Sequence, residues 1–532
     1  MVDYDDEYED EFDDELEGEE EDGEGVDERV AGMSAWGISV VVHALILLIV
    51  GTVYFVNEIA EKAPINLTKI EPPPKQEQER EERDVVKPEK TANIDADTPV
   101  EEPMVTQLDL PVEEVQTEDP VEMENKARGR EEAVSSSEMA SSGAFMAIGA
   151  GGGAAGAFGN RNGGGRRRAV GRYGGSRASE SAVEAALKWF AIHQSPNGQW
   201  DVDAYPANCD EGGQLCEPGR GHTGKDGDTA CSGYALLCYL GAGYDHKHMS
   251  KWRKVVKAGI EWLVAAQNAD GSWGRNYENG VCAMALAEAF ALSGDAALRE
   301  PAQKAIDYII SVQAKDGPED SGYAGLGWDY KRPNLSRMDS SVTGWCVMAL
   351  KSAKAAGLDT KGSLEGCKKW LEGAWKCCNP EWESLDPYDK SYFPYTWDKT
   401  AGTFEHKRLP CVGLLSAVFL GYRQGELLLE TLANTAVEEQ MPAGYPCNTY
   451  WMYYNTLGVF QVGGERWEKW NASVRDMLVQ AQRRDPPCFD GSWDYEGTEF
   501  HGHETGRLLS TAYCCLSLEV YYRYLPIAAG KQ

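Results

Sequence analysis

The sequence predicts an all-α protein: an (α/α)6 toroid, or closed double ring of helices, preceded by a single transmembrane helix and a disordered linker. From residue 178 onward, amphipathic helical segments alternate six times with mostly apolar ones. A helix that is apolar on every side must be buried, so six such helices ringed by six half-buried ones favour a closed ring. No strand-like alternation of useful length interrupts them, and one long apolar run lies far upstream.

Residues 1–29 form an acidic tail. The chain has 532 residues and a formal net charge of −35. About half of that excess lies between Asp3 and Glu28, a block that is expected to be disordered and self-repelling. A polyanion also repels phosphate, so no nucleic-acid partner is expected.

Residues 30–57 contain the predicted transmembrane helix. The run from Ala35 to Val56 has about 22 residues with a single ionisable group, so it spans roughly 33 Å, enough for a bilayer core. It begins far from Met1, follows an acidic region and lacks a small-residue cleavage site, so it differs from a secretory signal peptide. We therefore expect an uncleaved single-pass anchor.

Ser39 and His43 lie four residues apart in this run and share one helix face. An intramembrane histidine usually faces a partner, although a neutral imidazole on a lone helix is an alternative. The Ser-x3-His pattern, followed by the proline-rich stretch APINLTKIEPPPKQEQEREERDVVKPEK, resembles the membrane anchor of the energy-transducing protein TonB. This resemblance covers about the first hundred residues. It implies an ExbB/ExbD-like proton-channel complex as partner, in a bacterial inner membrane.

The orientation of the anchor has two interpretations. One basic residue, Arg29, precedes the run and several lysines follow it, which favours a cytoplasmic toroid. The TonB-like pattern implies export, and a candidate disulfide between Cys209 and Cys216 in one loop agrees with it. We expect export, with the toroid in the periplasm.

Two segments of biased composition separate the anchor from the ring. Residues 58–142 are rich in Pro, Glu and Lys without an apolar period, which predicts an extended, solvated linker. Residues 143–177 are rich in Gly and Arg. Such tracts can bind RNA, but the preferred interpretation is a flexible tether whose arginines meet lipid phosphates or the chain's own acids.

Residues 178–526 form the predicted toroid. Its first amphipathic helix is ESAVEAALKWFAIHQ, which is stopped by SPNG, and its first apolar helix is TACSGYALLCYLGAG. The pairing recurs five more times, and it ends with RWEKWNASVRDMLVQAQ and GRLLSTAYCCLSLEVYYRYL.

A Gln-x3-Gly-x-Trp pattern marks the ends of several amphipathic helices. Its copies are Gln194, Gly198 and Trp200; Gln267, Gly271 and Trp273; and a lengthened copy at Gln482, Gly491 and Trp493. A partial copy keeps Gln313 and displaces its tryptophan to Trp328. The pattern resembles the QW repeat of the squalene cyclase and protein prenyltransferase superfamily, over about residues 176–524. The resemblance implies a structural role, in which the glutamine caps the outer helix and the indole stacks against it.

The catalytic motifs of that superfamily are altered in this chain. Squalene–hopene-type cyclases protonate an alkene with the middle aspartate of Asp-x-Asp-Asp, followed by Thr-Ala. The stretch KDGDTA keeps Asp228 but has Gly227 in place of the proton donor; Asp226 is a substitute, and capping its helix is the preferred role for Asp228. Protein prenyltransferases hold zinc with Asp, Cys and His, but Ser510 stands where that histidine would be.

Other candidates lie near the starts of the apolar helices. The cavity candidates are Asp339, Tyr450, Glu504 and Arg507, with helix capping or surface pairing as the alternative. In HGHE, His501, His503 and Glu504 offer three potential metal ligands, with zinc as the candidate ion, although a polar loop is the commoner arrangement. No cofactor is otherwise predicted.

These observations predict a membrane-anchored toroid that binds an isoprenoid, lipid, glycan or protein partner in a TonB-like envelope complex. The alternative is an enzyme, either a terpenoid cyclase or transferase or a lyase, with non-standard catalytic residues. A fold alone does not choose between these functions. The missing proton donor and zinc ligands favour the binding protein, and a purely structural ring is a third interpretation.

Overall fold

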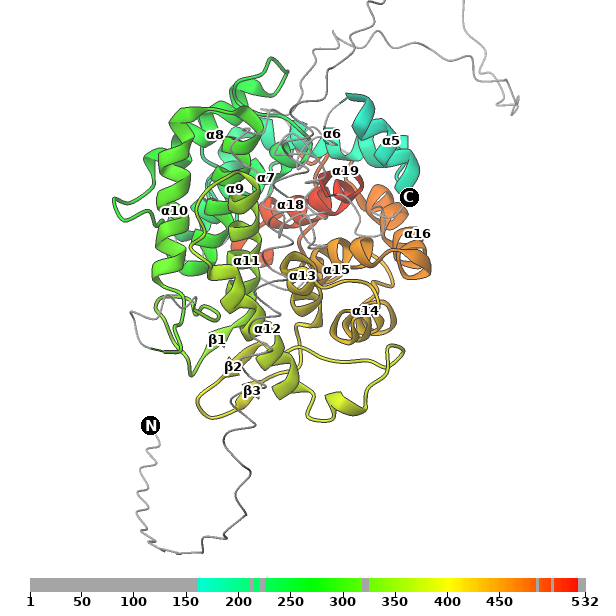
Figure 1. Ribbon diagram of the computed structural model, residues 1–532. Coiled ribbons are helices and arrows are strands. Elements are labelled where there is room, and N and C mark those ends of the chain that lie inside the picture. The colour runs from blue at the N-terminus through cyan, green and yellow to red at the C-terminus, as the bar shows by residue number, and fades with distance from the viewer. Residues whose placement is uncertain are drawn as a thin grey trace, which may run out of the picture. The chain divides into compact units, whose positions relative to one another are not determined.

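Six helices form an inner ring and six an outer ring in the part of the chain that the structure describes (Figure 1). The structure is a computed structural model that describes residues 161, 163–209, 214–219, 225–317, 325–484, 488–498 and 502–524. The predicted acidic tail, transmembrane helix and linker, with Ser39 and His43, lie outside these residues. Among the described helices, none combines the length and apolarity needed to cross a membrane.

The inner ring is closed, because each inner helix contacts the next one along the chain and the last contacts the first. These helices are buried on nearly every side, as their apolar sequences require. They are α7 (Lys225–Gly241), α9 (Asn276–Ser293), α11 (Ser340–Ala355), α13 (Pro410–Leu420), α15 (Thr449–Val462) and α18 (Arg507–Leu518).

Each outer helix precedes one inner helix in the chain and packs against two neighbouring inner helices. They are amphipathic: α8, for example, buries Val256, Ile260 and Leu263 and exposes Lys257 and Glu261. They are α6 (Arg177–Ile192), α8 (Arg253–Ala265), α10 (Arg299–Ser311), α12 (Ser363–Cys378), α14 (Leu427–Glu439) and α16 (Gly464–Ala481). This arrangement agrees with the predicted (α/α)6 double ring.

Four tryptophans anchor the loop that leaves an outer helix by bonding back to that helix. Each indole N–H donates to the backbone carbonyl four residues before the glutamine of its repeat. The pairs are Trp200–Phe190, Trp273–Leu263 and Trp328–Ile309 at 2.8 Å, and Trp493–Leu478 at 2.9 Å. Trp328 therefore has the same role as the others despite its displaced position in the sequence.

The glutamines join neighbouring outer helices, which corrects the expectation that each caps its own. In every copy the side-chain amide donates to a carbonyl near the start of the next outer helix in the ring. The pairs are Gln194–Val255 and Gln267–Pro301 at 3.0 Å, Gln313–Ser363 at 3.3 Å and Gln482–Ala182 at 2.8 Å. The pattern is thus a structural clamp between repeats.

The glycine of the pattern is fixed by both its backbone and its surroundings. Gly198, Gly271 and Gly491 have φ between +96° and +99°, which side chains with a Cβ rarely adopt. A Cβ at Gly491 would also lie 2.2 Å from the backbone oxygen of Ala185 on the adjacent outer helix. The close approach of loop and helix that the glutamine needs therefore excludes any larger residue.

Part of the predicted tether is helical: residues 163–173 form α5 (Gly163–Tyr173). Glycine is a poor helix former, so contacts outside the helix must stabilise it. Arg166 forms an ion pair of 2.6 Å with Glu180 and lies 4.4 Å from the ring centroid of Tyr522. Just upstream, Arg161 is fully buried against Glu288 at 2.7 Å. Both arginines thus meet the chain's own acids.

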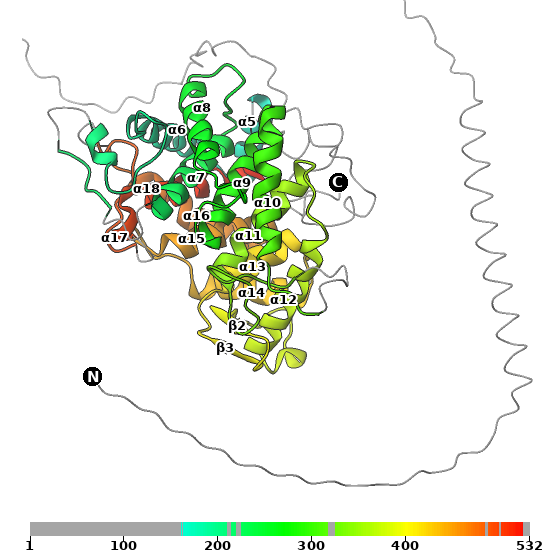
Figure 2. The ribbon, with the colours of Figure 1, turned by 90° about the vertical axis from the view of Figure 1, so that its left-hand side faces the viewer.

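A small antiparallel sheet, not anticipated from the sequence, lies at one end of the ring beside α12 (Figure 2). Its strands are β1 (Met338–Asp339), β2 (Thr396–Asp398) and β3 (Thr403–Glu405). They pair in the order β1-β2-β3, with Asp339 opposite Thr396. Strands of two or three residues are too short for a recognisable alternation. The short remaining elements are η2 (Tyr205–Asn208), η3 (Ala296–Leu298), η5 (Trp382–Ser384), α17 (Gly502–Thr505) and α19 (Val520–Arg523).

Candidate functional site

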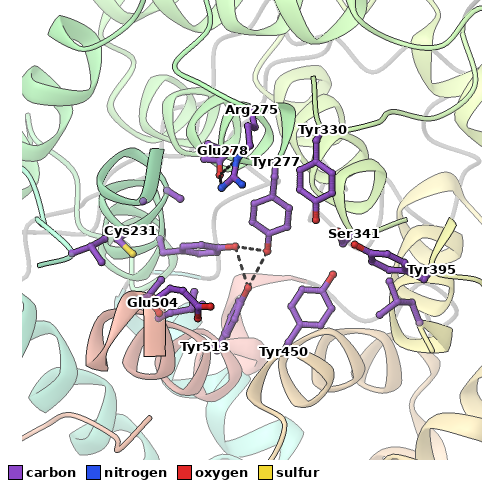
Figure 3. A pocket seen from close by; sticks show the side chains of 17 residues that line it. Cys231, Arg275, Tyr277, Glu278, Tyr330, Ser341, Tyr395, Tyr450, Glu504 and Tyr513 are labelled. Carbon is purple, nitrogen blue, oxygen red and sulfur yellow. Dashed lines mark hydrogen bonds and ion pairs between the residues drawn. The ribbon is translucent and has the colours of Figure 1, made fainter. Parts of the chain in front are cut away.

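A cavity opens at the centre of the ring, where the N-terminal ends of inner helices converge (Figure 3). The cavity has a volume of about 180 Å³. Six tyrosines dominate the lining. The lining residues are Val202, Gly227, Ala230, Cys231, Tyr234, Arg275, Tyr277, Glu278, Tyr330, Ser341, Tyr395, Leu409, Tyr450, Glu504, Thr505, Leu509 and Tyr513.

Three of these tyrosines, from α7, α9 and α18, bond to one another through their hydroxyl groups. Tyr234 lies 2.9 Å from Tyr277 and 3.0 Å from Tyr513, and Tyr277 lies 3.3 Å from Tyr513. Burial raises the pKa of Tyr277 to about 12 and holds the pKa values of Tyr234 and Tyr513 well above their usual range. The three hydroxyls therefore stay protonated at neutral pH and largely satisfy one another.

Charged side chains reach the cavity from two elements. Glu278, in the first turn of α9, is buried and pairs with Arg275 at 2.6 Å. Glu504 comes from the short helix α17. Figure 3 places both carboxylates on the side of the cavity away from Tyr395. The site thus joins an aromatic wall to a charged one, which holds Arg275 as well as the two carboxylates.

The helical domain matches known sequences over part of its length. A family model described as the squalene-hopene cyclase C-terminal domain matches residues 172–395. A squalene–hopene cyclase of Bradyrhizobium diazoefficiens is 27% identical over 188 residues, which are 33% of this chain and 26% of that protein. A probable squalene–hopene cyclase of Sinorhizobium fredii is 26% identical over 197 residues, 34% of this chain and 28% of that protein. The helical domain is squalene cyclase-like.

The matched region spans little more than a quarter of the length of these curated relatives. Solved structures are also similar to the chain. The type II terpene cyclase MstE from Scytonema has a TM-score of 0.40 and 12% identity, covering 64% of this chain and 97% of its own. The α-1,6-mannanase GH76A from Salegentibacter sp. HEL1_6 has a TM-score of 0.44 and 12% identity, covering 64% and 98%.

The squalene cyclase-like domain has no carboxylate at the position of the expected proton donor. Gly227 lines the cavity there, and Asp228 turns to the preceding loop, where it accepts a hydrogen bond of 2.9 Å from the backbone N–H of Val202. Because α7 begins at Lys225, Asp228 lies within the first turn and tethers a loop, which differs from the expected helix cap. Burial raises its pKa to about 6.

Asp339 stabilises the start of an inner helix. It is the N-cap of α11, and its carboxylate accepts bonds from the backbone N–H groups of Ser341 at 2.9 Å and Val342 at 3.1 Å. Burial raises its pKa. Its neighbour Ser341 reaches the cavity wall, so Asp339 positions the wall.

Arg507 forms ion pairs with two loops. It is buried at the start of α18 and pairs with Glu217 at 2.9 Å and Asp494 at 2.5 Å. These partners lie in two loops, which Arg507 joins to the inner ring.

Tyr450 and Glu504 line the cavity as anticipated. His503 is exposed, and its ring lies edge-on to Tyr495 at 5.7 Å between centroids. His501 and the side chain of Asp226 lie outside the described residues. Of the sequence candidates, the structure therefore brings two to the cavity wall.

Several lining residues were missed by the sequence analysis. The criterion that selected Tyr450, a polar residue near the start of an apolar helix, applies equally to Tyr277 and Glu278. Tyr330 and Tyr395 lie in loops without a distinguishing pattern. The backbone N–H of Ser340 donates a hydrogen bond to the carbonyl of Tyr395, and the backbone N–H of Asp339 donates one to the carbonyl of Trp328. These bonds hold the two loops against the start of α11.

Proposed function

We propose that the ring binds a small apolar ligand of the isoprenoid class in its central cavity. The observation that carries this proposal is the mutual hydrogen bonding of Tyr234, Tyr277 and Tyr513, which leaves aromatic faces as the main surface offered to a ligand. Aromatic faces contribute dispersion and hydrophobic contact over a large area. A glycan would require more unengaged hydroxyl partners, so it is the less favoured ligand.

Binding without cyclisation is favoured because Gly227 supplies no acid at the cavity wall. Protonating an alkene requires a carboxyl whose environment makes it a strong acid. Asp228 is bonded to the Val202 backbone, and its pKa of about 6 makes it a weak one.

The proposal is tested by identifying what the full chain retains after purification in mild detergent. Solvent extracts are analysed by mass spectrometry, and added geranylgeraniol is titrated by intrinsic fluorescence. Ala230→Phe places a ring inside the cavity and should abolish binding, because the cavity has little spare volume. Ala297→Phe adds the same ring on an exposed turn and should leave binding unchanged. A co-purified glycan, or geranylgeraniol binding that survives Ala230→Phe, would contradict the proposal.

An enzyme with non-standard catalytic residues, either a terpenoid cyclase or transferase or a lyase, is the second candidate. One observation favours it: Glu278 and Glu504 reach the same cavity from different elements, so one could act as acid and the other as base. Turnover of squalene or geranylgeranyl diphosphate by the wild type would support the enzyme, provided that Glu504→Gln abolishes turnover and retains binding.

We also propose that residues 35–56 anchor the ring in a bacterial inner membrane, facing the periplasm, with an ExbB/ExbD-like complex as partner. The Ser39–His43 pair within the apolar run supports this. His43→Ala should abolish co-purification of the proton-channel proteins, whereas Leu45→Ala, on the opposite face of the same helix, should retain it. An alkaline phosphatase fused after Gln532 should be active; an inactive fusion would place the ring in the cytoplasm.

A further inference from the structure

A cluster of one histidine and three cysteines lies outside the cavity, where the first and last repeats of the ring meet. His193 follows α6, and Cys209 and Cys216 lie in the loop between α6 and α7. Cys488 lies in the loop after α16, 272 residues beyond Cys216. His193 and Cys488 are fully buried, and Cys216 is nearly so.

The ligand atoms of three members of this cluster are mutually close enough to share one ion, and the sulfur of the fourth, Cys216, lies beside the histidine. The ligand atoms of His193, Cys209 and Cys488 all lie within 4.8 Å of one another. Nε2 of His193 lies 3.3 Å from Sγ of Cys209 and 3.4 Å from Sγ of Cys216. In a tetrahedral zinc site with Zn–S near 2.3 Å and Zn–N near 2.0 Å, nitrogen and sulfur ligands sit roughly 3.5 Å apart.

The histidine is oriented for ligation through Nε2. Its Nδ1 lies 2.8 Å from the backbone oxygen of Trp189. A carbonyl only accepts, so Nδ1 carries the proton and the lone pair of Nε2 points at the sulfurs. Metal-binding histidines typically make this bond to a carbonyl, which fixes the tautomer and the ring.

Trp189 positions both the imidazole of His193 and the distant Cys488. The indole of Trp189 stacks on the His193 ring at 4.3 Å between centroids. Its Nε1 donates to the backbone oxygen of Cys488 at 2.8 Å. Trp189 thus contacts one potential ligand from the first repeat and one from the last.

We propose that His193, Cys209, Cys216 and Cys488 bind a structural Zn²⁺ ion. Three sulfurs and one imidazole nitrogen form a Cys3His set, which closed tetrahedral zinc sites use and harder cations such as Mg²⁺ and Ca²⁺ do not. The Cys216 thiol, whose Sγ lies 3.0 Å from the Cys488 carbonyl, and the other two thiols bind as thiolates, and their three protons pass to the solvent as the ion binds. The ion joins the first repeat to the last and secures the closure of the ring.

Two other arrangements use the same residues. The first is the disulfide between Cys209 and Cys216 that the sequence suggested. In the structure these residues are not bonded to each other, and Sγ of Cys209 lies 3.3 Å from the backbone nitrogen of Cys216. The second is a metal-free cluster of hydrogen-bonded thiols. Both predict a chain without zinc, so metal content separates them from the proposal.

The test is zinc analysis of the full chain, purified in mild detergent without chelator, by inductively coupled plasma mass spectrometry. We expect about one zinc ion per chain in the wild type. Cys346→Ala changes a buried cysteine outside the cluster and should keep the ion. Cys209→Ala and Cys488→Ala should lose at least four-fifths of it. Cys209 is only partly buried, so its variant is expected to fold even where Cys488→Ala does not.

Spectroscopy gives a readout that does not depend on stability. After exchange with Co²⁺, the wild type should show the intense visible bands of tetrahedral thiolate coordination, and Cys209→Ala should lose or shift them. A zinc-free wild type, a Cys209–Cys216 disulfide in unreduced peptides, or full zinc content in Cys209→Ala would each overturn the proposal. None of these results depends on what binds in the central cavity.

Discussion

The side-chain amide of Gln482 donates a hydrogen bond of 2.8 Å to the backbone oxygen of Ala182, 300 residues earlier in the chain. The same amide lies 2.9 Å from the carbonyl of Gly491 in its own loop. Gln482 follows the last outer helix and Ala182 lies in the first, so this contact closes the outer ring. Equivalent glutamines join earlier pairs of outer helices, but those helices are also close along the chain.

Gln482→Met should lower the free energy of unfolding by about 1–3 kcal/mol, because two buried carbonyls lose their donor while the side-chain volume is kept. Urea unfolding followed by circular dichroism measures this. Gln303→Met is the matched control: Gln303 also donates to a carbonyl, that of Asp359 at 2.9 Å, but near the surface where water can replace it. An equal, small effect of both substitutions would contradict a closing role for Gln482.

Gly491→Ala should destabilise the ring more than an alanine at another glycine with positive φ. Gly491 has φ of +96°, and its Cβ would lie 2.2 Å from the oxygen of Ala185. Gly402 has φ of +65° with nothing within 4 Å of a Cβ, so Gly402→Ala should cost only about 1 kcal/mol of backbone strain. Thermal melts of the two variants give the comparison. Similar midpoints would mean that the loop can move away from α6 at little cost.

The double ring was predictable because its signal is repeated. The apolar inner helices and the Gln-x3-Gly-x-Trp pattern report on burial and helix ends, which are local properties. The partner of Gln482 was not predictable, since nothing local distinguishes a glutamine that caps its own helix from one that bonds to the next. Helix α5 was missed for a similar reason: its glycines oppose a helix, and the compensating contacts of Arg166 come from distant residues.

The cavity was located correctly in general terms, near the starts of the inner helices. Individual residues were less predictable, because a polar side chain at a helix start can face the cavity, as Glu504 does, or cap the backbone, as Asp339 does. Tyr330 and Tyr395 depend on loop conformations that distant residues set: their carbonyls accept hydrogen bonds from the backbone N–H groups of Asn276 and Ser340, respectively. Cys209 and Cys216 were paired from their loop position, and only the fold brings His193 and Cys488 to them.

A buried carboxyl near the closure of the ring should make stability depend on pH. Glu288 is paired with Arg161 at 2.7 Å and with Arg523 at 3.2 Å. Burial would raise its pKa, but the two arginines outweigh burial and lower it. Glu519 is also fully buried, and it lies 3.6 Å from Arg523. There burial outweighs the arginine and raises the pKa to about 8.

The folded chain therefore keeps a proton on Glu519 over a range in which the unfolded chain has released it. The contribution of Glu519 to the free energy of unfolding should fall as pH rises from about 5 to about 8, by at most ~1.4 kcal/mol per pH unit. Glu519→Gln keeps the neutral form at every pH. Its stability relative to the wild type should therefore increase across this range and level off above it.

Urea unfolding between pH 5 and 9 gives the free energy of unfolding of both the wild type and Glu519→Gln. Because the other titratable groups are common to both proteins, their contributions cancel in the difference. Glu365→Gln makes the same change on the exposed face of α12 and is the control for the substitution itself. A difference for Glu519→Gln that does not change with pH would mean that Glu519 is ionised in the folded chain throughout. In that case Arg161 and Arg523 together would neutralise two buried carboxylates, those of Glu288 and Glu519. Glu519→Gln would then remove one partner of this cluster and destabilise the ring at neutral pH.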